Sequence, residues 1–415
     1  MRALAVAALA ALAAPGVGAG ATVATEAGTE TKTGSAESRI AAALAAALPA
    51  EGNIDVIVID QPATAHAPRV RAVTPVAAPP ATVKAVLMDP AHYRAIIPGL
   101  IRADAARAPG GVTKVGWELE VPLFNLSGQL ALREHATGVE MTLLEGDLAP
   151  GRFTFTIAPR PGGSALMVDV QLDIANSTWL LRRIMARSPV GEPAALAAGA
   201  YVALRAVALR AERTGDAKAW RPTAEMAPPA TWLPRARPLA SPAFGPLRAL
   251  GAVGLIARTE TQRLAGVALA VSIARPVAAV TGELHDPRSW YGFPGWNKVE
   301  PRPGRYGDGA AVEDSLPLVE FDATWTAEPG PLPRWTATEG AIRGARLGWE
   351  IFPAAGGSAT DAVLLLHPRL ETTGRLARRS IQSEPLLEHG TSLALAFANA
   401  AGMKAALEAP QVKKK

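Results

Sequence analysis

The sequence has no cysteine among its 415 residues. Disulfide bonds, thiolate nucleophiles and cysteine-ligated zinc sites are therefore excluded. Histidine is also scarce, and none of its six copies stands at the i, i+4 spacing of a helical metal site. Nucleophile-elbow, phosphate-loop and paired-carboxylate signatures are absent as well. We therefore predict no catalytic residue, no metal and no cofactor, which favours a binding protein over an enzyme without excluding the enzyme.

Strong charge of one sign is missing too. The formal net charge is only +5 over the whole chain, and Lys413, Lys414 and Lys415 contribute three of these charges. Such a nearly neutral folded body does not have the basic surface that nucleic acid requires. We expect no nucleic-acid partner, and at most a transient contact of the terminal lysines with an anionic membrane surface, a solvated basic tail over 410–415 being the simpler interpretation. The sequence does not predict an oligomeric state.

Apolar runs long enough to span a membrane are not evident. Near the N-terminus, Arg2 precedes an apolar run from Ala3 to Ala14, and small residues end at Ala21. This pattern predicts a signal peptide over residues 1–21 with cleavage after Ala21, and hence a periplasmic or secreted protein. Residues 22–53 are predicted to form a flexible linker with a short helix over 38–49.

Apolar residues make up 49% of the chain and charged residues 19%, which is sufficient for sizeable cores. The length predicts two domains, and the chain resembles itself. The segment DPAHYRAIIPGL from Asp89 recurs as DPRSWYGFPGW from Asp286, and two later segments recur in the same order with similar offsets. Prolines crowd residues 215–246 and predict a semi-rigid spacer without helices. The predicted domains are therefore 54–214 and 247–409.

Each copy shows the same order of elements. Helical patterns follow Pro79 and Pro193, and strands between them alternate apolar and polar residues with period two. In the stretch from Ala165 to Ile174, for example, Met167 and Asp169 lie on the face opposite to Leu166 and Val168. This pattern predicts an antiparallel sheet with one apolar face and one wet face, followed by a long C-terminal helix.

This order, together with the motif Asp89, Pro90, Tyr93 and Pro98, resembles the START-related helix-grip (SRPBCC) superfamily, which includes polyketide cyclases and ubiquinone-binding START-like proteins. Asp286, Pro287, Trp290 and Pro294 match the motif less closely. The resemblance implies an α+β fold with two tandem helix-grip domains, each a curved antiparallel sheet wrapped around a long C-terminal helix. It also implies a hydrophobic cavity between the sheet and the helix of each domain.

On this resemblance we expect an exported protein that binds or transfers a hydrophobic small molecule such as a lipid, sterol, quinone or polyketide. A polyketide cyclase or aromatase-like enzyme and a non-binding envelope scaffold stay open as alternatives. The second copy is expected to differ in ligand or to have lost binding, because its motif is less regular. The candidate cavity residues are Trp117, Leu119, Phe153, Phe155, Val170, Tyr201, Leu204, Phe321, Trp325, Trp349 and Phe397.

Overall fold

The structure is a computed structural model, and it describes part of the chain. The predicted signal peptide and the basic tail lie outside the described residues. The described residues are 30–49, 53–60, 68–121, 124–174, 182, 190–213, 232, 234–286, 296–302, 309–316, 319–354, 357–370 and 384–409.

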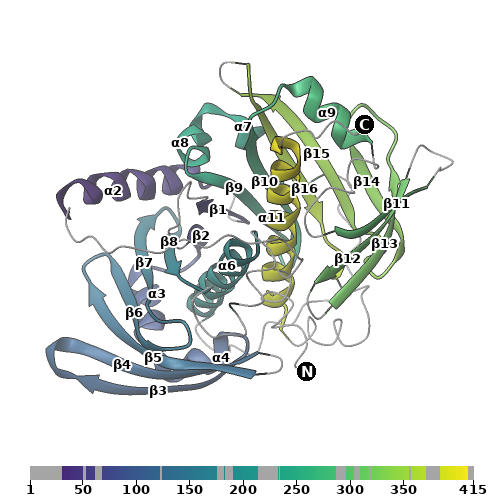
Figure 1. The fold of residues 1–415 in the computed structure, drawn as a ribbon. Coiled ribbons are helices and arrows are strands. Elements are labelled where there is room, and N and C mark those ends of the chain that lie inside the picture. The colour runs from purple at the N-terminus through teal and green to yellow at the C-terminus, as the bar shows by residue number, and fades with distance from the viewer. Residues whose placement is uncertain are drawn as a thin grey trace.

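The first half of the fold, residues 54–212, alternates a few short helices with strands and ends in a long helix (Figure 1). Its strands and helices are β1 (Ile54–Asp60), β2 (Arg69–Val76), α3 (Pro80–Leu87), α4 (Tyr93–Ile96), β3 (Leu100–Ala108), β4 (Val112–Val121), β5 (Phe124–His135), β6 (Gly138–Gly146), β7 (Gly151–Arg160), β8 (Gly163–Leu172) and α6 (Gly191–Glu212).

The second half, residues 251–408, repeats this order. Its strands and helices are β9 (Gly251–Arg258), β10 (Leu264–Ile273), α9 (Val277–His285), β11 (Trp296–Arg302), β12 (Gly309–Leu316), β13 (Val319–Ala327), β14 (Arg334–Gly340), β15 (Arg346–Pro353), β16 (Thr360–His367) and α11 (Leu386–Glu408).

Side-chain hydrogen bonds repeat together with the elements. Glu212 at the end of α6 accepts the backbone N–H of Ala77 at 3.1 Å, and Glu408 at the end of α11 accepts the N–H of Ala274 at 2.8 Å. Both long helices are therefore held to their own half by the same contact. Because this contact involves the last turn of each helix, it also aligns α6 with α11 at a separation of 196 residues.

The described strands all belong to one antiparallel sheet. Its order is β11-β12-β13-β14-β15-β16-β10-β9-β1-β2-β8-β7-β6-β5-β4-β3. The two halves meet where β1 pairs with β9, with Ile57 opposite Gly254. The sequence predicts two separate sheets, and the structure instead joins them edge to edge. The physical reason is that β1 and β9 would each present an unpaired edge in a buried place, and their pairing satisfies those backbone groups.

The two long helices lie side by side on one face of this sheet (Figure 1). α6 packs over β1, β2 and β8, and α11 packs over β10 and β16. Among the described helices α6 alone has the length and hydropathy of a membrane span. It is nevertheless a core helix, because most of its residues are buried between the sheet and α11.

The opposite face of the sheet is covered by α2 (Glu30–Ala47), α7 (Arg237–Ala240) and α8 (Gly245–Arg248). The short helix predicted over 38–49 falls largely within α2, which begins earlier, at Glu30. The sequence predicts a proline-rich spacer without helices, but the end of this segment forms short helices that bury Leu239 and Leu247. Proline is compatible with these helices because it stands in their first turn, where no N–H has to be donated.

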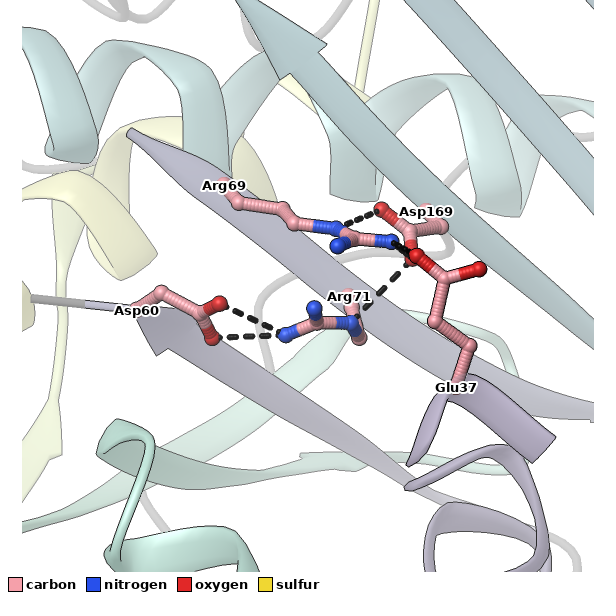
Figure 2. Close-up of polar contacts among 5 residues, drawn as sticks. All are labelled: Glu37, Asp60, Arg69, Arg71 and Asp169. Atoms are coloured by element: carbon pink, nitrogen blue, oxygen red, sulfur yellow. Dashed lines mark hydrogen bonds and ion pairs between the residues drawn. The ribbon is translucent and has the colours of Figure 1, made fainter. Parts of the chain in front are cut away.

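Helix α2 is also held by charge. Arg69 of β2 binds Asp169 of β8 at 2.7 and 2.6 Å and reaches Glu37 of α2 at 3.0 Å (Figure 2). Arg71 binds Asp60 of β1 at 2.8 and 2.7 Å and Asp169 at 3.1 Å. Burial alone would lower the pKa of Arg69, but the hydrogen bond and the charge of Asp169 raise it above its ordinary value. The expected wet face of β8 is therefore covered at its centre, and Met167 is buried there.

Candidate functional site

A cavity of about 260 Å³ lies in the first half, between α6 and the strands that bend around it. α6 packs directly on β1, β2 and β8. Strands β3–β7 continue beyond the helix and curve beneath it (Figure 1). The cavity occupies the gap between these strands, α4 and the free face of α6.

Small side chains form the helical wall of the cavity. Ala195, Gly199, Ala203 and Val207 line it from successive turns of α6, at the i, i+4 spacing that places residues on one helix face. Gly199 is exposed although most of the helix around it is buried, and a Cβ atom built on it would meet nothing within 4 Å. The shortness of these side chains therefore contributes directly to the free volume.

The remaining wall is apolar, with side chains from α4, the sheet and α11. Among the described lining side chains, the only N–H and O–H groups belong to Tyr93 and Trp117. The Tyr93 hydroxyl donates to the carbonyl of Leu87, and burial raises the pKa of this tyrosine well above its usual value. The lining residues from these elements include Tyr93, Ile97, Leu100, Trp117, Leu119, Leu126, Leu130, Met141, Leu143, Phe153, Phe155, Leu172 and Leu387.

Four of the residues predicted from the sequence line this cavity, namely Trp117, Leu119, Phe153 and Phe155. Their alternation along β4 and β7 is the signal that predicts it, because every second residue of a strand faces the same side. The small residues Ala195, Gly199 and Ala203 are not in the predicted set. Helical spacing could have found them, but the phase of α6 relative to the sheet is a tertiary property.

Three other predicted residues of the first half lie elsewhere. Val170, Tyr201 and Leu204 are fully buried, but they are not among the residues that line the cavity. The reason is the position of α6 over β8 and β2, which places Val170 and Leu204 in the contact between helix and sheet. Tyr201 faces β1, where its hydroxyl donates to Asp55.

Three of the four predicted residues of the second half lie in the interior of that half. Trp325, Trp349 and Phe397 are buried on β13, β15 and α11, away from the cavity of the first half. Phe321 belongs to β13, and its side chain lies outside the described residues. Conversely, Leu387 of α11 lines the cavity of the first half, which no pattern in the sequence indicates.

A buried polar cluster lies on the opposite side of α6 and connects the two halves. Arg258 binds the carboxylate of Asp55 at 2.9 and 3.0 Å, and Tyr201 and Thr74 each donate to that carboxylate at 2.6 Å. Arg205 donates to the Thr74 hydroxyl at 2.7 Å. Both halves contribute to this cluster, so it fixes their relative position.

The pKa values in this cluster follow from burial and charge. Burial would raise the pKa of Asp55, but Arg258 and Arg205 lower it below its ordinary value. Burial and the charge of Asp55 raise the pKa of Tyr201 well above its ordinary value. Burial, followed by the charges of Arg205 and Arg258, lowers the pKa of His389 to about 3. At neutral pH the cluster therefore contains an ionised Asp55, a neutral Tyr201 and a neutral His389.

No protein-family model matches this chain, and no curated protein sequence matches it. Several solved structures match it, however. The chain resembles START-type proteins. They include the di-domain ARO/CYC StfQ from the steffimycin biosynthetic pathway, at 12% identity and a TM-score of 0.26 over 80% of this chain and 97% of that chain.

Two further matches each cover less than half of this chain. The Zhui aromatase/cyclase from Streptomyces sp. R1128 has 18% identity and a TM-score of 0.31 over 35% of this chain and 93% of that chain. A STAR-related lipid transfer protein from Xanthomonas axonopodis has 14% identity and a TM-score of 0.29 over 40% of this chain and 97% of that chain. Because these TM-scores lie below 0.5, the function has to be argued from the cavity itself.

Proposed function

We propose that this protein binds and transfers a hydrophobic small molecule, a lipid, sterol, quinone or polyketide, as an exported protein of two tandem helix-grip units. The observation that carries this proposal is the lining of the cavity. The cavity volume of about 260 Å³ is far larger than a few waters need, since each water requires roughly 10–15 Å³ of such a volume. Apolar walls bind an apolar ligand through area removed from water, at about 25 cal/mol per Å².

The cavity favours a carrier over a cyclase. Acid–base chemistry requires a titratable side chain within hydrogen-bonding distance of the reacting group. The only titratable side chain in the described lining is Tyr93, and its hydroxyl is occupied by the carbonyl of Leu87. The free volume likewise favours a binding protein over a scaffold, because a scaffold has no use for an unfilled core.

Export is the second part of the proposal. Its support is the sequence of residues 1–21, in which Arg2 is followed by an apolar run and small residues up to Ala21. N-terminal sequencing of the protein recovered from the periplasm or the medium of a bacterial host tests it. A mature chain that begins at Thr22 would support export, whereas an intact Met1 in the cytoplasm would refute it.

The binding proposal is tested by filling the cavity from the helix. Gly199→Leu places a side chain in the free space beside α6, and it removes a glycine from a helix interior, so the fold should not be weakened. The matched control is Gly282→Leu in α9, an exposed helical glycine that also has nothing within 4 Å of its Cβ position.

The probe is N-phenyl-1-naphthylamine, an uncharged dye whose fluorescence rises in apolar surroundings. We expect the wild-type protein and Gly282→Leu to bind the dye equally, and Gly199→Leu to lose at least tenfold in affinity. Mass spectrometry of solvent extracts from the purified proteins should find equal amounts of any co-purified ligand in the wild type and Gly282→Leu, and less in Gly199→Leu. Equal dye binding by all three proteins would refute the proposal.

A further inference from the structure

The sheet of this protein ends at β3 on one side and at β11 on the other (Figure 1). β3 pairs with β4 along one edge, and no described segment pairs with its other edge. The backbone N–H and C=O groups on that free edge are therefore available to a strand from another molecule. The strand is regular there, because its register on β4 shifts once, between Leu100 and Arg102, and then runs unbroken to Ala108.

The side chains of β3 are accessible along its whole length. Ile101 is 37% exposed and is one of only two large apolar side chains exposed in the described part of the chain. Arg102 and Asp104 are 50% and 76% exposed. They lie 3.7 Å apart, and Arg102 lies 3.9 Å from Glu118, distances that are longer than hydrogen bonds. β3 therefore presents an apolar group and two opposite charges that are only loosely held within the chain.

The spacing of these charges is self-complementary. Two copies of β3 that pair edge to edge around a two-fold axis perpendicular to the sheet run antiparallel, and opposite residues then lie on the same face. With the axis at Ala103, Arg102 of each copy lies opposite Asp104 of the other, so this ion pair forms twice. An axis at Arg102 or Asp104 would place two like charges opposite each other, and an axis at Ala105 would leave the charges unpaired.

The same register suits the rest of the strand. Ile101 of one copy lies opposite Ala105 of the other, so the exposed apolar side chain gains a cover twice. Arg107, the third charged residue, lies opposite Gly99 and opposes no charge. Sheet edges are commonly protected from pairing by proline or by repelling charges. No proline lies within Leu100–Ala108, and the opposite charges of this strand attract a second copy.

We propose that the free edge of β3 is an interface for a second copy of this chain, paired antiparallel around Ala103. The sheets of the two copies then continue into each other in a two-fold dimer. The partner is a copy of the chain because the charge pattern complements itself. One strand pair buries little area compared with a permanent dimer, so this dimer forms and dissociates readily. The interface does not rest on the carrier function, because Arg102 and Asp104 do not line the cavity.

Sedimentation velocity of the full chain at low salt tests this proposal. The wild type should show a monomer–dimer equilibrium at concentrations up to about 0.5 mM, the range of weak interfaces. Arg102→Asp and Asp104→Arg each place like charges opposite each other, and each should weaken the dimer roughly tenfold or more. The control Lys114→Asp reverses an exposed charge on β4, one strand away from the edge, and should dimerise as the wild type does.

Restoring the opposite charges should restore the dimer. An equimolar mixture of Arg102→Asp and Asp104→Arg should dimerise, because each aspartate then lies opposite an arginine. The double variant Arg102→Asp/Asp104→Arg should dimerise like the wild type for the same reason. Hydrogen exchange locates the interface, because the amides of β3 should gain protection as the concentration of the wild type rises, but not in Arg102→Asp. Both side chains are at the surface, so neither substitution should unfold the protein.

Four results would overturn the proposal. The wild type would stay monomeric, the single variants would dimerise as the wild type does, the mixture would behave like its two components alone, or a dimer would form without protection of β3. Species larger than a dimer would also overturn it, because they would indicate head-to-tail pairing of β3 with β11, an arrangement that does not close.

Discussion

Arg258 of β9 holds the carboxylate of Asp55 of β1 with two hydrogen bonds, from Nε at 2.9 Å and from Nη2 at 3.0 Å, across the strand pair that joins the two halves. The two side chains are only 2% and 0% exposed. A buried pair of this kind adds little net stability compared with apolar residues, but removing one partner leaves an uncompensated charge in the core. It therefore specifies how the halves join more than how stable they are.

Asp55→Asn should destabilise the whole protein. The substitution removes the charge of Asp55 that offsets those of Arg258 and Arg205, and the expected loss in the free energy of unfolding is about 3–5 kcal/mol, measured by urea denaturation. The control is Glu134→Gln, which removes a partly exposed ion pair with Lys84 and should cost no more than about 1 kcal/mol. Equal effects of the two substitutions would show that the Asp55 cluster does not hold the halves together.

Acid should weaken the fold through His389. The pKa of His389 is about 3 in the folded protein and about 6.5 in an unfolded chain. Between these values the unfolded chain binds a proton that the folded protein does not, so stability is lost as the pH falls below about 6.5, at about 1.4 kcal/mol per unit for this group.

His389→Phe keeps a ring against Tyr201 and removes this proton uptake. Between pH 6.5 and 5 the variant should lose about 2 kcal/mol less stability than the wild type, measured by urea denaturation at each pH. His285→Phe, at an exposed position, controls for the loss of one histidine. Parallel pH profiles for wild type and His389→Phe would contradict the assignment of a neutral, buried imidazole.

The contact between the two long helices should be intolerant of side-chain volume at Gly390. A Cβ atom at this position would lie 2.9 Å from Cγ2 of Val202, which itself lines the cavity. Gly390→Val should therefore push α11 from α6 and cost about 1–3 kcal/mol in thermal unfolding experiments. Gly282→Val in α9 has open space around it and serves as the control. A variant Gly390→Val as stable as this control would show that the helices are not in close contact.

Replacing a leucine of the cavity wall by alanine should lower the free energy of unfolding far more than the same change at the surface. Leu126 lines the cavity and is 1% exposed, whereas Leu144 on β6 is 45% exposed. Leu126→Ala should cost about 2–5 kcal/mol and Leu144→Ala less than about 0.5 kcal/mol, measured by urea denaturation. A saturating amount of N-phenyl-1-naphthylamine should restore part of the loss in Leu126→Ala, because a ligand that binds only the folded state stabilises it. No restoration would show that Leu126→Ala does not bind the probe, and it would contradict the expected retention of the cavity.

Much of the local structure was readable from the residues. The alternation in β7 and β8 predicts strands and their inner faces, and Pro79 predicts the start of α3, because period-two patterns and proline geometry act over a few residues. The same local patterns predict Trp117, Leu119, Phe153 and Phe155 on the face that lines the cavity. They could not predict that Val170 of β8 and Leu204 of α6 lie in the contact between helix and sheet, since that depends on where the helix crosses the sheet.

By itself the sequence determined the order of the strands and helices, their repetition along the chain and the apolar character of one face of each strand. The tertiary structure alone decided that β1 and β9 join the halves into one sheet, that Asp55 and Arg258 meet although they are far apart in the chain, and that Gly199 of α6 faces the cavity. The reason is range. Propensity and periodicity act between near neighbours, whereas edge pairing, charge burial and helix phase depend on residues that only the folded chain brings together.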